Sequence, residues 1–298
     1  MIHIQLFGTT LAIPEGETAA SADFGGAKPR QILEILALAE GAPVPKDRLA
    51  EMVWAGAPPA SYVGTLESYI CLLRRRLNCA RGRSAAITTT TNGYQLDMRQ
   101  VRVDLIDCRA LLARAASAPK TERVDLTLAA VEMARQPLLA SEAYVEWADR
   151  ERAAFHQQLV DACVGAAEHA LSLERPEKAL ALARTARQFD RFSEPAARQL
   201  MRAMKRLGRR ADALRVFLDL RRDVIEELGV EPGPVTHQLY LEMLHAEPDG
   251  ATAGSPEPEE LRTLLGLLRQ ALEALPGVEP TKGDSGLSYV AVKVLSVA

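Results

Sequence analysis

The stretch that decides the fold is residues 60–77, ASYVGTLESYICLLRRRL. At about 100° of rotation per residue, four apolar positions fall within about 60° of one another on one side of a helix. These positions are Leu66, Ile70, Leu73 and Leu77. The opposite side carries small, polar and basic residues, namely Gly64, Glu67, Ser68, Cys71 and Arg75. The pattern predicts a helix with a buried apolar back and an open polar front.

A basic hairpin is expected directly after this helix. Residues 86–91 and 94–96 are rich in strand-forming types and flank Asn92-Gly93, a strong turn signal between strands. No acidic residue lies between Glu67 and Asp97, whereas five arginines do: Arg74, Arg75, Arg76, Arg81 and Arg83. A helix with such a front can enter a major groove while arginines hold phosphates. A solvated basic face is the alternative interpretation of the same residues.

The residues before this helix predict a small sheet and two further helices. Ile2, Ile4 and Leu6 alternate with polar residues and predict a strand over 2–7, with partner strands at 10–13 and 18–24. Gly25-Gly26 ends the sheet, and an apolar stripe from Ile32 to Leu38 predicts the first helix. A short second helix is expected from Lys46 to Trp54. We therefore expect a sheet, three helices and a hairpin in residues 1–103.

Residues 105–245 read as helix almost throughout, with breaks at proline and glycine. Glu177–Leu180 (EKAL) recurs as Ala211–Leu214 (ADAL), 34 residues later, and Leu173 with Leu207 and Arg187 with Arg221 keep that offset. Thirty-four residues is the tetratricopeptide period. Stacked helical hairpins are predicted for residues 104–247, although chance similarity in an Ala/Leu-rich stretch remains the alternative.

The last part of the chain, residues 248–298, has a different composition. AEPDGATAGSPEP (246–258) is typical of a linker. One amphipathic helix is predicted over 259–275 from Leu261, Leu264, Leu265, Leu268, Leu272 and Leu275. Residues 287–297 favour a strand. A segment this short does not fold alone. Its helix is expected either to dock on the rest of the chain or to pair with another chain.

Composition narrows the class of protein. The chain has 298 residues, 48% hydrophobic and 25% charged, which suits about two globular domains. No apolar run reaches the roughly 18 residues of a membrane span, and the N-terminus does not resemble a secretory signal. The four cysteines form no CxxC pair, so no zinc ribbon or disulfide framework is expected. The histidines, Gly25–Lys28 and GDSG at 283–286 form no recognisable catalytic, phosphate-binding or metal site, so we expect no enzyme and no cofactor.

Several segments resemble a known pair of domains. KPRQILEILALAEGAPVPKDRLAEMVW (28–54), PPASYVGTLESYICLLRRRL (58–77) and ITTTTNGYQL (87–96) resemble an OmpR-type winged helix-turn-helix domain. VDLIDCRALL (103–112), WADRERAAF (147–155) and GRRADALRVFLDLRRDVIEELGVEPGP (208–234) resemble the bacterial transcriptional activator domain. This pairing is similar to the Streptomyces antibiotic regulatory protein (SARP) family of transcription activators, and the resemblance covers residues 2–247.

The resemblance implies an α+β winged-helix domain (1–103), an all-α tetratricopeptide-like helical-repeat domain (104–247) and a C-terminal segment (248–298). It also implies a cytoplasmic protein that binds double-stranded promoter DNA at direct repeats, as a homo-oligomer, and contacts RNA polymerase holoenzyme. The implied recognition-helix residues are Thr65, Glu67, Ser68, Cys71, Arg74, Arg75 and Arg76. The implied wing residues are Thr90, Asn92, Gly93 and Tyr94, and Tyr94 matches a family wing tyrosine whose implied role is largely packing. One departure is Cys71-Leu72, which stands where a Ser-Arg pair is common in such helices.

Two roles on the helix are expected to differ in kind. Glu67 is repelled by phosphates unless it accepts a hydrogen bond, for which cytosine N4 is the best donor, so it is expected to act on specificity. Arg74 and Arg75 lie one to two turns later and are expected to act on affinity. The alternative function is a protein-interaction scaffold that uses the helical repeats and carries a degenerate winged helix. Salt-sensitive binding to duplex DNA separates the two.

Overall fold

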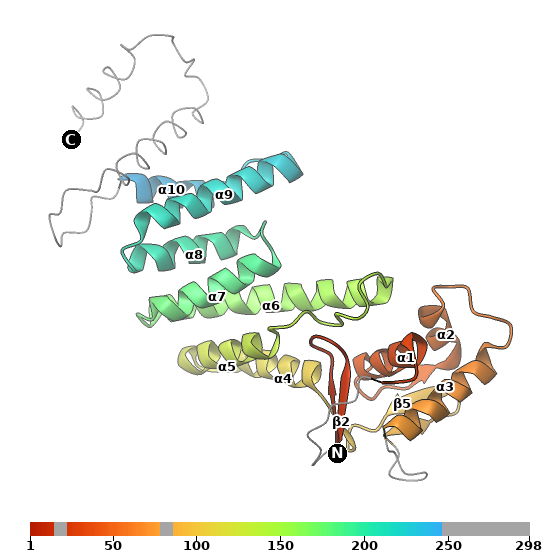
Figure 1. Ribbon diagram of the computed structural model, residues 1–298. Coiled ribbons are helices and arrows are strands. Elements are labelled where there is room, and N and C mark those ends of the chain that lie inside the picture. Colours follow the sequence, from red (N-terminus) through yellow and green to blue (C-terminus); the bar gives the residue numbers. More distant parts are fainter. Residues whose placement is uncertain (15–22, 78–85, 246–298) are drawn as a thin grey trace, which may run out of the picture.

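A computed structural model describes residues 1–14, 23–77 and 86–245 of the chain (Figure 1). Several sequence-based expectations fall outside these residues. They are most of the strand predicted at 18–24, Arg81 and Arg83, the linker, the helix at 259–275 and the strand at 287–297. In the described part of the chain, no helix has the length and apolar character needed to cross a membrane.

The N-terminal sheet has three strands in the order β2-β1-β6. β1 (Ile2–Gln5) pairs antiparallel with β2 (Leu11–Pro14), which confirms the strands predicted at 2–7 and 10–13. β6 (Val101–Val103) pairs parallel with β1 and was not anticipated from the sequence. Asp23 and Phe24, the described end of the segment predicted as a strand at 18–24, form no strand.

Three helices and a second sheet complete this part of the chain. α1 (Ala27–Leu38), α2 (Lys46–Val53) and α3 (Tyr62–Arg76) confirm the three predicted helices. The second sheet has the order β3-β5-β4 and consists of β3 (Val44–Pro45), β4 (Ile87–Thr89) and β5 (Gly93–Leu96). β4 and β5 pair antiparallel as the predicted hairpin. The two-residue strand β3 joins the hairpin to the start of α2.

Gly93 lies in the hairpin at a different position from the one that the Asn-Gly turn signal predicts. The turn is formed by Thr90–Asn92, and the Thr90 amide donates to the Gly93 carbonyl at 2.9 Å, so Gly93 already belongs to β5. A Cβ atom at Gly93 would lie 1.9 Å from the Val44 carbonyl oxygen. The glycine is therefore required by the close approach of β3, and the predicted hairpin is correct for a different physical reason.

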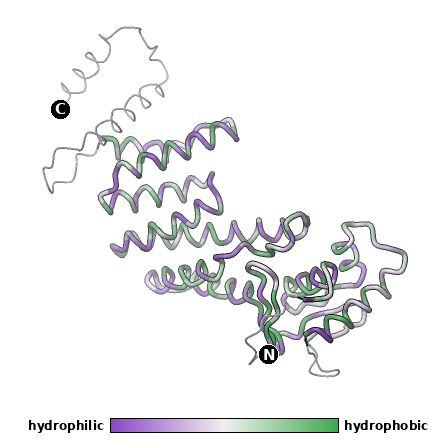
Figure 2. The backbone as a smooth tube through the Cα atoms, viewed as in Figure 1, coloured by the Kyte–Doolittle hydropathy of each residue, from purple (hydrophilic) through white to green (hydrophobic). Residues whose placement is uncertain are grey.

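The second part of the chain is a stack of helices (Figure 1). Its members are α4 (Asp104–Ser117), α5 (Lys120–Met133), α6 (Glu146–Ser172), α7 (Pro176–Phe189), α8 (Glu194–Arg206), α9 (Arg210–Leu228) and α10 (Pro234–His245). Each packs on the next in sequence. α7 and α9 begin 34 residues apart, and Ala179 and Ala213 are both fully buried, as the repeat predicts. Figure 2 shows hydrophilic and hydrophobic residues alternating along these helices, as amphipathic packing requires.

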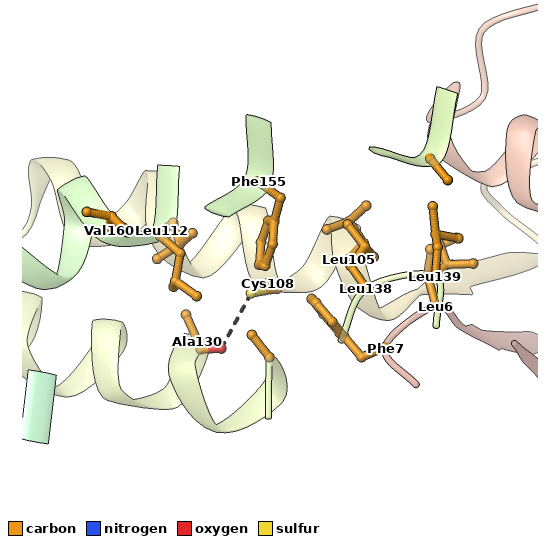
Figure 3. Close-up of a cluster of buried hydrophobic side chains, with 14 of the residues drawn as sticks. Leu6, Phe7, Leu105, Cys108, Leu112, Ala130, Leu138, Leu139, Phe155 and Val160 are labelled. Carbon is orange, nitrogen blue, oxygen red and sulfur yellow. Dashed lines mark hydrogen bonds between the residues drawn. The ribbon is translucent and has the colours of Figure 1, made fainter. Parts of the chain in front are cut away.

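The N-terminal sheet is joined to the helical stack by hydrogen bonds and apolar packing. The Asp104 carboxylate, at the start of α4, accepts from the Leu6 amide at 2.8 Å and the Phe7 amide at 3.1 Å. The Phe7 ring packs against Phe155 of α6 with centroids 5.4 Å apart (Figure 3). Leu6, Phe7, Leu105, Leu138 and Leu139 gather in one buried cluster (Figure 3). The sheet is thus part of the core that holds the two halves together.

A buried charge cluster joins α1 to the segment between α5 and α6. Glu142, 2% exposed, accepts from Arg30 at 2.7 Å and from Gln31 at 2.7 Å. Glu34, fully buried on α1, accepts from the Thr10 hydroxyl at 2.5 Å and lies 3.6 Å from Arg30. Burial, followed by the charge of Glu142, raises the pKa of Glu34 to about 8. The directional hydrogen bonds of this cluster therefore help to fix the relative position of the two halves, in addition to their apolar contact.

Candidate nucleic-acid interface

The recognition-helix candidate α3 has the predicted buried back. Leu66, Ile70 and Leu73 are at most 1% exposed, and Leu77, just after the helix, is 3% exposed. Tyr69, on the flank of α3, stacks on Trp54 with ring centroids 6.4 Å apart. Burying three large aliphatic side chains contributes roughly 1.5–3 kcal/mol each. The back of α3 is therefore committed to the core, which leaves only its front for a ligand.

The front of α3 is open in the way the sequence predicts. Gly64, Glu67, Ser68, Cys71 and Arg75 are all exposed. The hydroxyl of Ser68 donates to the Gly64 carbonyl at 2.9 Å, and that of Thr65, half-buried on the flank, donates to the Ser61 carbonyl at 3.2 Å. Both hydroxyls keep acceptor capacity for a ligand.

Val63 is a residue that sequence reasoning missed. It is 39% exposed, in the first turn of α3, next to Gly64. An exposed valine beside a polar front can contact a thymine methyl group. On the helical wheel Val63 lies about 20° from Ile70 and about 40° from Glu67, at the border between the apolar stripe and the polar front, so its angle alone does not identify it as exposed.

The three consecutive arginines have three different environments. Arg74 donates through Nε to the Ile87 carbonyl at 3.0 Å and through Nη2 to the Thr89 hydroxyl at 2.9 Å, so it braces α3 against the hairpin. Arg76 pairs with Asp23 at 3.1 Å. Arg75 is exposed and, among the described residues, its side chain makes no hydrogen bond or ion pair. Of the three arginines, Arg75 is therefore the one whose guanidinium group is available to bind a phosphate.

Lys46 is a second residue that the sequence did not reveal. Its Nζ donates to Glu67 at 2.8 Å and lies 5.7 Å from the Tyr94 ring centroid, and its amide donates to the Asn92 carbonyl at 2.9 Å. The hydrogen bond to Glu67 raises the pKa of Lys46. Lys46 therefore links α2, the hairpin turn and the front of α3. No spacing rule predicts this pair, because its partners are 21 residues apart on different helices.

The predicted wing residues divide into surface and core. Asn92 is exposed and Thr90 is half-buried in the turn. Gly93 is buried against Val44, and Tyr94 is 3% exposed, with a pKa raised by burial. In this structure Gly93 and Tyr94 pack under the hairpin and support the surface that Asn92 presents, and their contact with DNA stays a prediction. Among the described residues, no cluster of His, Cys, Asp or Glu could hold a metal ion.

Comparison with known proteins shows the family of this chain. Residues 25–96 match the model described as "Transcriptional regulatory protein, C terminal", and residues 103–244 match "Bacterial transcriptional activator domain". Regulatory protein DnrI of Streptomyces peucetius is 31% identical over 246 residues, which cover 77% of this chain and 88% of DnrI. The chain belongs to the SARP family. It is a DNA-binding transcriptional activator with an OmpR-type domain followed by a bacterial transcriptional activator domain.

Two further similar proteins are longer than the region that they share with this SARP protein. Regulatory protein AfsR of Streptomyces coelicolor is 26% identical over 255 residues, which cover 83% of this chain but 24% of AfsR. The solved structure of Mycobacterium tuberculosis EmbR in complex with a low affinity phosphopeptide superposes with a TM-score of 0.68 at 21% identity. It covers 91% of this chain and 70% of the EmbR chain. The likeness confirms the predicted fold class, a winged-helix domain followed by a tetratricopeptide-like helical domain.

Proposed function

We propose that this SARP protein inserts the front of α3 into the major groove of promoter DNA and lays the hairpin turn, Thr90–Asn92, on the adjacent backbone. The observation that carries the proposal is the division of α3 into a fully buried back and a front of small, polar and basic side chains. A helix of this size fits the major groove, where base edges are distinguishable.

The side chains of the front have separate roles in this proposal. Glu67, Ser68 and Cys71 face the base edges, with the Glu67 carboxylate accepting from cytosine N4. Arg75 holds a phosphate, and Arg76 and Thr65 add backbone contacts at the flanks. Arg74 acts indirectly, because its two hydrogen bonds hold the hairpin at a defined distance from α3. In the free protein Lys46 donates a hydrogen bond to Glu67. In the DNA complex Glu67 instead accepts from cytosine, and Lys46 contacts a phosphate.

The helical domain, residues 104–247, is the part that activates transcription in this proposal. It contacts RNA polymerase holoenzyme and neighbouring protomers, while the winged-helix domain, residues 1–103, reads one half-site. A single winged helix reads few base pairs, so at least two protomers bind side by side on direct repeats. In this proposal the protein acts in the cytoplasm, where bacterial promoters are transcribed.

Footprinting on promoter fragments selected by genome-wide binding tests this function. We expect protection of two half-sites in the same orientation and an affinity that falls steeply with salt, because phosphate contacts release counterions. Arg75→Glu reduces protection of both half-sites. Protection of one half-site at saturation contradicts the side-by-side assembly. Salt-insensitive or absent binding to duplex DNA instead supports a protein-interaction scaffold.

A further inference from the structure

A pocket of about 540 Å³ opens on the helical stack, away from α3. It lies between the end of α6, the second half of α8 and α10, which are alternate helices of the stack. Leu171, Leu239 and Met243 give it an apolar lining. The pocket therefore offers an apolar surface that the repeat packing of the described residues does not use.

The rim of the pocket is basic, and two of its basic side chains have no acidic partner among the described residues. Arg206 is balanced by Glu174 at 2.7 Å. Arg202 and Lys205, one turn of α8 apart, are exposed, and in the described ranges neither side chain makes a hydrogen bond or ion pair. An occupant that suits this pocket presents apolar side chains to the lining and carboxylates to Arg202 and Lys205. Alternate helices of a repeat stack are a surface on which such solenoids bind partners.

The chain itself carries a segment with this chemistry. Residues 259–275, EELRTLLGLLRQALEAL, combine leucines at helical spacing with acidic residues at their start, Glu259 and Glu260, and Glu257 precedes them. Residues 248–298 hold seven acidic and four basic residues. The segment lies outside the described residues, and six of its seven leucines form the stripe that predicts an amphipathic helix in need of an apolar partner.

The segment can reach the pocket. Met243 lines the pocket and stands two residues before His245, where α10 ends. The 13 residues of 246–258 span at most about 45 Å when extended, and a flexible chain of that length has ends roughly 20 Å apart. Tethering at this distance gives an effective concentration of about a millimolar, so weak contacts suffice.

We propose that residues 259–275 of the same chain occupy this pocket, with leucines on Leu171, Leu239 and Met243 and with Glu259 and Glu260 facing Arg202 and Lys205. The inference concerns the helical domain alone and does not depend on DNA binding. An activator partner that uses the same side of the stack then competes with this segment.

Hydrogen exchange of the full chain, read by mass spectrometry, tests the docking. We expect the amides of 259–275 to exchange about tenfold more slowly in the native protein than in the variant Arg202→Glu/Lys205→Glu, because docking protects them. The matched control is Lys120→Glu/Arg184→Glu, which changes two exposed cations of the same domain outside the pocket by the same charge. The control is expected to retain the native protection.

A charge exchange distinguishes the pairing from general repulsion. Adding Glu259→Lys/Glu260→Lys to the pocket variant is expected to restore the slow exchange. The milder variant Arg202→Gln/Lys205→Gln replaces the glutamates if thermal unfolding shows that they disturb the fold, and it is expected to lose part of the protection. Absence of protection in the native protein, equal protection in all variants, or failure of the exchanged charges to restore it overturns the proposal. Protection that disappears on dilution assigns the pocket to a second copy and also overturns it.

Discussion

Charged side chains occur both on the front of α3 and at the junction between the two halves, but they are paired in opposite ways. At the junction, Asp104 is 7% exposed and accepts hydrogen bonds from three backbone amides, and Glu142 is 2% exposed and accepts from two side chains. On α3, Glu67 is exposed and accepts from one lysine. A buried, fully paired charge fixes geometry, whereas an exposed, sparsely paired one is left for a ligand.

This difference in burial and pairing indicates that the two regions have separate roles. The junction sets how the winged-helix domain is held on the helical domain, and the α3 front sets what the protein reads. Changes at the junction are therefore expected to alter stability first, and changes on α3 are expected to alter DNA binding without altering stability.

The largest effect is expected for Asp104→Ala. Three backbone amides, those of Leu6, Phe7 and Leu105, lose their acceptor in a region closed to water. We expect the free energy of unfolding to fall by about 3 kcal/mol, measured by urea denaturation. Asp107→Ala is the control, because this carboxylate pairs at the surface with Arg102, itself 64% exposed, and its loss is expected to cost less than about 1 kcal/mol. Equal losses for the two variants contradict the structural role of Asp104.

The buried Glu34 predicts a pH dependence of stability. Burial raises its pKa to about 8 in the folded chain from 4.5, so between these values the folded state holds a proton that the unfolded state has released. Stability contributed by this carboxyl is therefore complete below pH 4.5 and is lost as pH rises through about 8. Arg30, Glu142 and Thr10 are the polar groups that face it.

Glu34→Gln keeps a neutral, hydrogen-bonding side chain and removes this titration. The free energy of unfolding of the variant, relative to the native protein, is expected to rise by about 2 kcal/mol from pH 6 to pH 7.5. Glu132→Gln, which changes an exposed glutamate, serves as the control. A difference between native protein and Glu34→Gln that stays constant with pH means that the junction does not hold a protonated Glu34.

The sequence predicted local elements well because their signals are local. The leucine stripe of α3, the strand alternation of Ile2 and Ile4 and the offset between Ala179 and Ala213 each follow from short-range periodicity. The strand β6 was missed because Val101–Val103 are three residues whose pairing depends on β1, about a hundred residues earlier.

The sequence predicted which residues of the candidate site are exposed, but not which side chains contact one another there. A helical wheel identifies Glu67 and Arg75 as exposed, but it does not show that Lys46 holds Glu67 or that Arg74 turns back to Ile87. The family resemblance assigns Gly93 and Tyr94 to the wing, and the structure buries both because β3 covers this side of the hairpin. Contacts between distant segments decide these cases, and a single sequence carries no periodic signal for them.

The next prediction concerns Glu67, whose role is specificity. Glu67→Ala is expected to relax preference at one base pair by about 1–2 kcal/mol, at the lower end of the usual range because Lys46 shares the carboxylate. The variant also frees Lys46 for a phosphate, so binding to unrelated DNA is expected to strengthen. Selection from a randomised duplex library measures both quantities. An unchanged base-preference profile contradicts the role of Glu67, and Lys46→Ala is expected to weaken binding to all sequences alike.

The smallest effect is expected for Arg75→Ala and appears in the salt dependence of binding. Arg75 is exposed and, in the ranges that the structure describes, unpaired, so its loss removes one phosphate contact without disturbing the core. Each lost contact lowers the slope of log affinity against log salt by about 0.9, so between 50 mM and 200 mM salt the native protein is expected to lose about 3.5-fold more affinity than the variant. Fluorescence anisotropy with a specific and an unrelated duplex measures this slope. Arg184→Ala removes an exposed cation of the helical domain and is expected to leave the slope unchanged. If Arg75→Ala also leaves the salt slope unchanged, Arg75 does not contact the DNA backbone. The difference between the unpaired charge on α3 and the paired charges of the junction then has no role in DNA binding.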